Sequence, residues 1–333
     1  MLGGPRSRRD FIAGLGSAGA SWAAPMVARG QSRATPVIGV LTSGVVDMSA
    51  PFLVGFRQGL TETGYVEGQN VAIHYVWGED QYNHMPLLAA DLIARQVAVI
   101  VAFGNVAARA AKSATTKIPV VFLVGSDPVG IGLVESLNGP QTNMTGVSIL
   151  NNDLETKRLE VLLEVVPQAA AIGFLVNADS PTTELKLRDM RRAAGLLDRN
   201  LVVFNARTPA DFAAAFVSSA DQPVRALAIA SDKMFLDHGK ELGQLAARQP
   251  IPAIAAYRDF ARAGGLMSYG TDASEANRQV GIYAGRILKG SKPYDLPVVQ
   301  STKVEFVVNL KAAKALGLAL SLPLLGRADE VIE

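Results

Sequence analysis

The sequence predicts an α/β protein made of two doubly wound units. Two observations support this fold class. From Pro36 onward, short apolar runs rich in β-branched residues alternate with amphipathic segments of about 10–15 residues, which is typical of parallel sheets covered by helices on both faces. The alternation starts again near Asn151, and 333 residues suffice for two domains of ordinary size.

The first unit is expected to contain five strands separated by amphipathic helices. The predicted strands cover residues 36–44, 70–78, 97–104, 118–125 and 144–150. The predicted helices cover residues 51–63, 82–95 and 104–114. Most of these strands are continuous apolar runs, as in sheets that are buried on both faces.

The second unit repeats this rhythm without visible repetition of residues. Its predicted strands are 170–177, 201–206, 225–231, 251–256 and 264–270. Its predicted helices are 153–165, 182–197, 209–219 and 234–248, with a short one before the last strand. A helix (273–289), a Pro-containing link (292–298), a final strand (303–309) and a short helix with a Leu-rich tail complete the chain.

The first thirty residues have the features of an export signal. Arg8 and Arg9 precede Phe11 and Ile12, as in the twin-arginine motif, and the 14 residues from Ile12 to Pro25 carry no charge. A bilayer span needs about 20 apolar residues, so a membrane anchor is excluded. We expect cleavage after Gly30; the alternative is a disordered basic tail.

A dinucleotide-binding pattern within this signal is a chance match. Gly14, Gly16 and Gly19 spell G-x-G-x-x-G. The pattern has meaning only between a strand and a helix, and no strand precedes it here.

Composition excludes several classes of protein. Residues 1–30 carry four arginines and one aspartate, a charge of +3, so the total of +2 leaves about −1 for the rest, which argues against a nucleic-acid partner. The absence of cysteine excludes disulfides, thiolate nucleophiles, Cys-ligated metals and a lipid anchor. No later segment has 18 uncharged apolar residues. We therefore expect an exported, periplasmic protein without stable membrane insertion after cleavage.

Polar residues follow nearly every predicted strand. In open α/β sheets, ligands bind outside the carboxyl ends of the strands. Hydroxyls and helix N-termini can bind a carboxylate, an aspartate can bind an amine, and tyrosines can enclose an apolar body. The candidate ligand-binding residues are Ser43, Gly44, Asn105, Ser126, Asp127, Asn177, Ser180, Thr182, Asp232, Tyr257 and Tyr269.

Each candidate has a purely structural alternative. Helix capping alone explains a serine, threonine or aspartate where a helix begins, as for Ser126, Asp127 and Asp232. Glycines can serve tight turns, and the tyrosines can be core or rim residues. The set is more informative than its members because polar residues recur at the strand ends of both units.

Catalytic constellations are hard to assemble. The three histidines are His74 in a strand, His84 at the start of a helix, and His238 within a helix, far from a strand end. No zinc-protease, nucleophile-elbow or P-loop motif is present. Asp127 and Asp232 could form a carboxylate pair, but no motif favours catalysis. We expect no enzyme, no catalytic residue, no metal and no cofactor.

Several longer stretches carry a resemblance to a known family. They are GLTETGYVEGQNVAI (59–73), FLVGSDPVGIGLVESL (122–137), LETKRLEVLLEVVP (154–167), AGGLMSYG (263–270), GRILKGSKPYDLPVVQSTKVEFVVNLKAAKALGL (285–318) and RADEVIE (327–333). With these motifs the chain resembles, from Val37 to Glu333, the ABC-transporter substrate-binding proteins of the tryptophan/tyrosine-uptake type.

The resemblance implies the fold of a type I periplasmic binding protein. Two Rossmann-like lobes would be joined by three crossover strands, with a ligand cleft between the lobes. The crossovers are expected near 149–152, 270–272 and 300–302. Lobe 1 would comprise 36–150 plus 271–300, and lobe 2 would comprise 151–270 plus 301–333.

The resemblance also implies a function. The protein would capture a small amphipathic ligand, such as an aromatic or branched amino acid or an aromatic carboxylate, and deliver it to an ABC permease with its ATPase. It supports Ser43, Asn105, Ser126, Asp127, Asn177 and Asp232 as ligand contacts, and we expect a monomer. The alternatives are a periplasmic sensing module for a membrane receptor and, third, an exported hydrolase.

Overall fold

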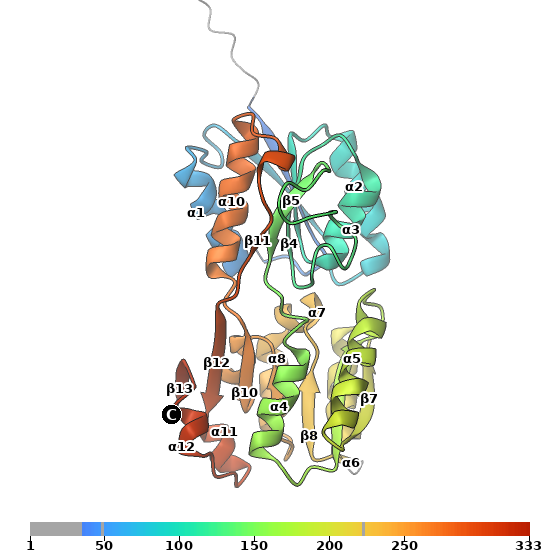
Figure 1. Cartoon of the computed structure of the whole chain (residues 1–333), viewed down its shortest axis with the longest axis vertical. Helices are drawn as coiled ribbons and strands as arrows, with labels where there is room; N and C mark the ends of the chain where they lie inside the picture. The colour runs from blue at the N-terminus through green and yellow to red at the C-terminus, as the bar shows by residue number, and fades with distance from the viewer. Residues whose placement is uncertain (1–34, 48–49, 222–223) are drawn as a thin grey trace, which may run out of the picture. The chain divides into compact units, whose positions relative to one another are not determined.

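The computed structural model describes residues 35–47, 50–221 and 224–333 (Figure 1). The predicted export signal, its cleavage after Gly30 and the glycine pattern within it lie outside the described residues. Residues from Thr35 to Glu333 form one compact unit that contains two sheets. Among the helices of the described ranges, none is long and apolar enough to cross a membrane.

The first sheet is wholly parallel, as the sequence predicts. Its order is β11-β5-β4-β3-β1-β2, and every pairing between neighbours is parallel. The strands are β1 (Val37–Thr42), β2 (Ala72–Trp77), β3 (Val99–Phe103), β4 (Val120–Val124), β5 (Met144–Ser148) and β11 (Val299–Gln300). β3, β4 and β5 are buried along their whole length, which explains their continuous apolar runs.

Helices cover this sheet on both faces and bury two apolar clusters. They are α1 (Pro51–Glu62), the 3₁₀ turn η1 (Tyr82–His84), α2 (Met85–Ala94), α3 (Asn105–Ala114), η3 (Pro293–Asp295) and α10 (Ser274–Leu288). α10 comes from far along the chain and packs beside α1 (Figure 1). Glycines allow this close approach, because a Cβ at Gly281 would lie 2.1 Å from the carbonyl oxygen of Phe56.

The second sheet has the order β13-β12-β10-β9-β8-β6-β7. Its strands are β6 (Ala171–Asn177), β7 (Asn200–Ala206), β8 (Ala226–Ile229), β9 (Ala253–Ala255), β10 (Met267–Thr271), β12 (Val304–Asn309) and β13 (Glu330–Ile332). β12 runs antiparallel to β10, a departure from an all-parallel sheet. The reason is that the chain leaves the second sheet at the end of β10 and re-enters it through β12 from the first sheet.

The helices of the second sheet largely follow the expected ranges. They are α4 (Glu155–Val165), α5 (Thr183–Leu196), η2 (Pro209–Asp211), α6 (Phe212–Asp221), α7 (Lys233–Asp237), α8 (Gly239–Ala247), α9 (Arg258–Arg262), α11 (Leu310–Ala315) and α12 (Leu322–Leu325). The single helix expected at 234–248 is wrong, since the helix breaks at His238, where φ is −102° and ψ is 21°. The three-residue strand β13 was not expected, because so short a run has no readable period.

Three stretches of chain lead from one sheet to the other, and they are tied to each other. They follow β5, β10 and β11. The Asn151 side chain accepts a hydrogen bond from the Thr271 backbone N–H at 2.7 Å. Asp272 pairs with Lys303, with 2.7 Å between Oδ2 and Nζ. These crossovers lie close to the predicted ones, while the exact limits of the two lobes stay a prediction.

Candidate ligand-binding site

The carboxyl ends of the strands bring several predicted residues together in the first sheet. The Ser126 hydroxyl follows β4 and accepts hydrogen bonds from the amides of Asn105, at 2.9 Å, and Asn152, at 2.5 Å. Asn105 Oδ1 accepts a bond from the Gly125 backbone N–H at 3.2 Å. Asn152 was not predicted; its place directly after β5 was the available signal. The result is a neutral cluster of amides and a hydroxyl.

The end of β1 makes close contact with the second sheet's helices. The Ser43 hydroxyl is buried and has no hydrogen-bond partner among the described residues. A Cβ at Gly44 would lie 1.8 Å from Asp237 Oδ2, so a larger residue at this position would displace the Asp237 side chain. Beside it, the Val45 backbone N–H donates to Asp237 Oδ2 at 3.2 Å.

The helix start expected at Ser126 and Asp127 is wrong, because the described chain forms turns between β4 and β5, and Asp127 closes one of these turns. Its side chain is exposed, and its two oxygens accept hydrogen bonds from the backbone N–H groups of Val129 and Gly130, both at 3.0 Å. Asp232, its suggested catalytic partner, has a separate set of partners. A role of Asp127 in ligand binding therefore stays a prediction with little geometric support.

Asp232 is the centre of a second cluster. It precedes α7 and is buried, and its Oδ1 accepts hydrogen bonds from the Asn177 amide at 3.0 Å and the Met234 backbone N–H at 3.1 Å. A third bond comes from the Tyr82 hydroxyl at 2.6 Å. Oδ2 accepts none from the part of the chain that the structure describes. Three hydrogen bonds thus hold Oδ1 of Asp232, and Oδ2 can still accept hydrogen bonds from a ligand.

Tyr82 reaches Asp232 from the first sheet's turn η1, and sequence reasoning missed it. The two residues are 150 positions apart, so no local pattern links them. Burial, and then the Asp232 carboxylate, raise the pKa of Tyr82 well above 10.0. The hydroxyl therefore keeps its proton and donates a hydrogen bond to Asp232 Oδ1.

Ser180 and Thr182 lie together in the loop between β6 and α5. Their hydroxyls are 3.2 Å apart and both residues are buried. Thr182 stands at the N-cap of α5 without a side-chain capping bond, so the capping explanation does not account for it. The pair lies close in sequence to Asn177, whose Oδ1 accepts from the Asp179 backbone N–H.

A buried charged network lies behind the Asp232 cluster, and sequence reasoning missed it as well. Arg158 donates from Nη2 to the Ser231 hydroxyl at 2.8 Å and to the Asn151 carbonyl at 2.9 Å. Its Nη2 also lies 3.0 Å from Glu155 Oε2, with side-chain exposures of 1% and 3%. Glu155 Oε1 accepts the Ser231 backbone N–H at 2.7 Å. The network therefore holds the turn that carries Asp232.

Lys186 of α5 completes this network. Its ammonium donates to the Ser231 carbonyl, and burial lowers the pKa of the lysine. The sequence did contain a signal for Glu155 and Arg158. Both lie on the same face of α4 as Leu159 and Leu162, and two charges on an apolar stripe indicate a buried ion pair.

The two predicted tyrosines differ in their surroundings. Burial, and then the Asp232 carboxylate, raise the pKa of Tyr257, which places this phenol in the electrostatic field of the Asp232 cluster. The Tyr269 ring instead packs against Phe306, with 5.8 Å between ring centroids, in a pocket of about 250 Å³ that includes Lys157 and Asp329. The Tyr269 side chain joins neither polar cluster, whereas its backbone carbonyl accepts a hydrogen bond from Arg158 Nη1 at 3.0 Å.

The ends of the two sheets contact each other through charged side chains. His238 Nε2 lies 3.1 Å from Asp80 Oδ2, and Lys233 Nζ lies 5.1 Å from the centre of the Phe52 ring. The expectation that His238 sits within a helix, far from any strand end, is wrong. The residue is at the junction of α7 and α8 and meets the loop that follows β2.

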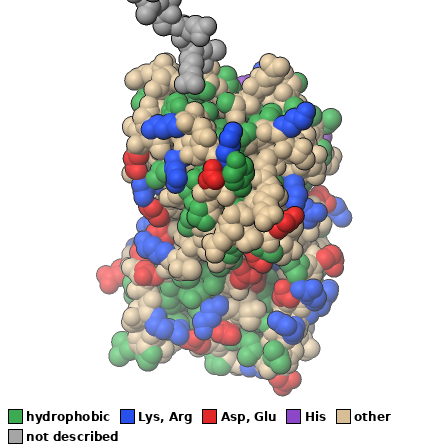
Figure 2. All heavy atoms as spheres, turned by 45° about the horizontal axis from the view of Figure 1, so that its top comes forward, with side chains coloured by type: hydrophobic (Ala, Val, Ile, Leu, Met, Phe, Trp, Pro, Cys, Tyr) green, Lys and Arg blue, Asp and Glu red, His purple; other side chains and the backbone are tan. Residues whose placement is uncertain are grey.

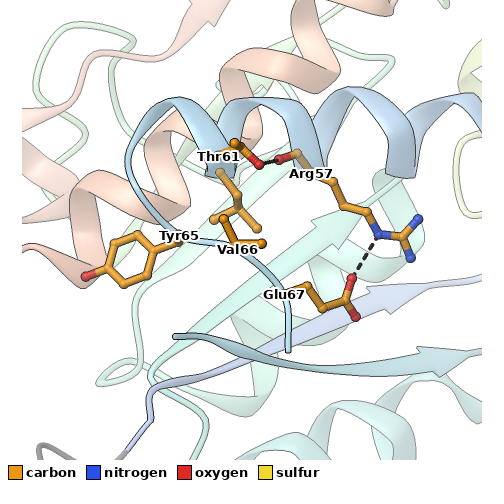
Figure 3. A pocket seen from close by; sticks show the side chains of 6 residues that line it. Arg57, Thr61, Tyr65, Val66 and Glu67 are labelled. Atoms are coloured by element: carbon orange, nitrogen blue, oxygen red, sulfur yellow. Dashed lines mark hydrogen bonds and ion pairs between the residues drawn. The ribbon is translucent and has the colours of Figure 1, made fainter. Parts of the chain in front are cut away.

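A pocket near α1 lies apart from these clusters (Figure 3). It has a volume of about 240 Å³, and Arg57, Tyr65 and Glu67 are among its lining residues. Arg57 Nε donates to Glu67 Oε2 at 2.9 Å. The loop that carries Glu67 leads into the amino end of β2. This pocket therefore lies at the opposite edge of the sheet from the carboxyl ends of the strands, where the polar clusters are.

The surface carries charges of both signs. Figure 2 shows acidic and basic side chains interspersed over the face drawn, in agreement with the near-neutral charge of the chain after residue 30. Within the described ranges, no group of three or more His, Asp or Glu side chains could hold a metal ion.

Comparison with known proteins gives consistent matches. The model of a family described as ABC transporter substrate binding protein matches residues 46–332. A tyrosine-binding protein of Clostridioides difficile (strain R20291) is 27% identical over 266 residues, which cover 79% of this chain and 75% of that protein.

Solved structures extend these matches. An ABC domain from Streptococcus pneumonia in complex with L-Trp is 24% identical, with a TM-score of 0.77 over 89% of this chain and 100% of that chain. A ligand-free, open substrate binding protein with adhesive properties from Clostridium difficile is also 24% identical, with a TM-score of 0.61 over 90% and 99%. The fold is that of type I periplasmic binding proteins.

Proposed function

Because the chain belongs to the family of ABC transporter substrate-binding proteins, we propose that it captures an aromatic or branched amino acid, or an aromatic carboxylate, between its two lobes. The lobes are those expected from the sequence, 36–150 plus 271–300 and 151–270 plus 301–333. After export to the periplasm, the closed complex delivers the ligand to an ABC permease and its ATPase. The protein acts as a monomer and as a carrier, without catalysis.

The Asp232 carboxylate carries this proposal. Asn177, Tyr82 and the Met234 N–H fix Oδ1, while Oδ2 accepts no hydrogen bond from the described residues. A buried carboxylate is costly unless it is paired, so the remaining oxygen favours a cationic partner. The α-ammonium group of an amino acid supplies that charge.

The first sheet offers donors for the other end of an amino acid. The buried Ser43 hydroxyl has no partner among the described residues, and the Asn105–Ser126–Asn152 cluster presents neutral donors. Neutral donors bind a carboxylate without adding a second charge to a buried site. The polarity of the two clusters thus matches a zwitterion, with its ammonium at the second lobe and its carboxylate at the first.

The side chain of the ligand adds apolar burial. An enclosed aromatic ring buries about 150–250 Å², which corresponds to roughly 4–6 kcal/mol. A micromolar complex needs about 8 kcal/mol, so recognition of the charged ends must supply the rest. The matches to a tyrosine-binding protein and to an L-Trp complex support an aromatic amino acid as the first ligand to try.

A thermal-shift screen with the purified protein tests the proposal. The compounds are L-tyrosine, L-tryptophan and branched amino acids, each beside analogues that lack the amino or the carboxyl group. A ligand at about 100 times its Kd stabilises by about 2.7 kcal/mol and raises the Tm. We expect intact amino acids to shift the Tm more than either analogue. Turnover of an ester, amide or glycoside without any ligand shift would favour a hydrolase instead.

Two aspartate variants form a matched pair for this test. Asp232→Asn should weaken binding of the amino acid by about 10- to 100-fold, because an ammonium loses its counter-charge. Asp127→Asn should change affinity less than about twofold, since Asp127 is exposed and its carboxylate accepts the backbone N–H groups of its own turn. Binding that survives Asp232→Asn unchanged would remove this residue from the site.

A further inference from the structure

The loop between β2 and η1 projects from the first sheet toward the second. Its residues from Gly78 to Tyr82 are here called the arm. Backbone bonds anchor it to the end of β1: the Asp80 N–H donates to the Ser43 carbonyl at 2.8 Å, and the Glu79 N–H donates to the Gly44 carbonyl at 3.0 Å. Glu79 and Asp80 have φ angles of 48° and 61°, in the left-handed region that non-glycine residues seldom occupy.

Two side chains of the arm bind the second sheet's helices. Asp80 Oδ2 meets His238 Nε2 at 3.1 Å, and the Tyr82 hydroxyl donates to Asp232 at 2.6 Å. The Asp80 side chain is 8% exposed and the His238 side chain is 20% exposed. Strained backbone persists where surrounding contacts determine it. Here the backbone bonds come from the end of β1, and the side-chain contacts of Asp80 and Tyr82 come from the second sheet's helices.

The surroundings of His238 favour its charged form. Its Nε2 faces Asp80 Oδ2, and its Nδ1 lies 3.3 Å from Glu241 Oε2. The Phe212 ring of α6 packs beside the imidazole, with 5.8 Å between centroids. Asp237, which is next in the chain, is paired with Lys233. Only an imidazolium donates from both nitrogens, since a neutral ring turns one lone pair toward a carboxylate.

We propose that the arm is an interlobe latch: Tyr82 positions Asp232 for the ligand, and His238 in its protonated form binds Asp80 and holds the lobes together. The latch makes closure, and with it ligand affinity, stronger in mildly acidic surroundings. The role of Tyr82 in positioning Asp232 rests on the proposed function. The role of the His238–Asp80 pair in closure does not, because closure is a property of the protein without ligand.

The direction of the pH effect follows from the contacts. The hydrogen bond to Asp80, then the charges of Asp80 and Glu241, raise the pKa of His238 above its ordinary value of 6.5. The contribution of this pair to the closed state is complete below 6.5 and is lost as the pH rises through the raised value. A neutral or alkaline medium therefore favours opening.

The first experiment measures closure without any ligand. The chain contains no cysteine, so two introduced cysteines take spin labels at defined sites. Leu87 of α2 and Leu196 of α5 are suitable, with exposures of 73% and 82%. Pulsed electron–electron double resonance should show a short distance between the two labels at about pH 5.5. A growing population of longer distances should appear toward about pH 8.

His238→Gln should abolish this pH dependence. The matched control is His74→Gln, since His74 pairs with Asp91, 3.8 Å away, within the first sheet's own elements. The control should keep the pH dependence of the unmodified chain. An unchanged distance profile in His238→Gln, or equal loss in both variants, would overturn the latch.

The second experiment isolates the positioning role of Tyr82. Tyr82→Phe keeps the ring and deletes the hydroxyl bound to Asp232. We expect calorimetry to show about tenfold weaker binding of the amino acid and an unchanged affinity for its analogue without the amino group. Equal weakening of both would mean that Tyr82 only packs. If no compound binds at all, the proposed function fails while the distance measurements still decide on the latch.

Discussion

The polar side chains at the ends of the two sheets differ in charge. At the first sheet, Asn105, Ser126 and Asn152 form a neutral cluster in which each bond joins an amide to a hydroxyl. At the second sheet, Asp232 rests on a turn held by buried Arg158 and Lys186. A neutral hydrogen bond contributes about 0.5–1.5 kcal/mol to the stability of the fold. A buried charge is destabilising as soon as it loses its counter-charge. The second site is therefore the more vulnerable of the two to single substitutions.

The largest effect should come from removing the arginine of the charged network. Arg158→Met leaves Glu155 buried without its counter-charge and takes a donor from Ser231. We expect a loss of about 3–5 kcal/mol in the free energy of unfolding, measured by urea denaturation. Arg327→Met is the control, because its ion pair with Glu164 is exposed and should contribute at most about 1 kcal/mol. Similar losses in both variants would contradict the contrast between the two sites.

A double variant sharpens this comparison. Adding Glu155→Gln to Arg158→Met removes the uncompensated negative charge, so part of the lost stability should return. For two residues in contact, the changes in the free energy of unfolding caused by the single substitutions do not add up in the double variant. The deviation from additivity measures the interaction energy between the two side chains. Strict additivity would mean that Glu155 and Arg158 act independently.

A smaller effect is expected in the neutral cluster. Asn105→Ala removes one donor from Ser126 and leaves the Gly125 N–H without its acceptor. The expected loss is about 1–2 kcal/mol in the same urea assay, since no charge is left unpaired. Asn138→Ala, at an exposed loop position, should change stability by less than about 0.5 kcal/mol. A loss as large as that of Arg158→Met would remove the distinction between the sites.

The smallest effect concerns the crossover carboxylate Asp272. Partial burial acts to raise its pKa, but hydrogen bonds from Lys303 and Ser274 outweigh burial and hold the pKa far below 3.8. The bonds therefore stabilise the fold above 3.8, and their contribution is lost as the pH falls through the lowered value. Asp272→Asn should cost about 1 kcal/mol near pH 7. Its Tm deficit should shrink on acidification, and a deficit that is constant with pH would contradict the assignment.

The sequence predicted most helices and strands of the fold, but it predicted fewer of the residues that meet in the candidate site. Asn177 and Asp232 were predicted because parallel strands place their carboxyl ends at one edge, and the structure joins the two by a hydrogen bond. Tyr82 and His238 were missed, since their contacts join distant segments and leave no local period. Tyr269 was included because it follows an apolar run, yet it sits within β10, where its ring faces Phe306.

The hydrogen-bonded crossovers have a consequence for the lifetime of a bound ligand. Asn151 joins the first crossover to the second through Thr271, and Asp272 joins the second to the third through Lys303. Because the crossovers are joined in this way, we expect them to move together when the lobes open. The ligand that we propose would then leave in such joint opening events. Its residence time would depend on their frequency as well as on the contacts in the site.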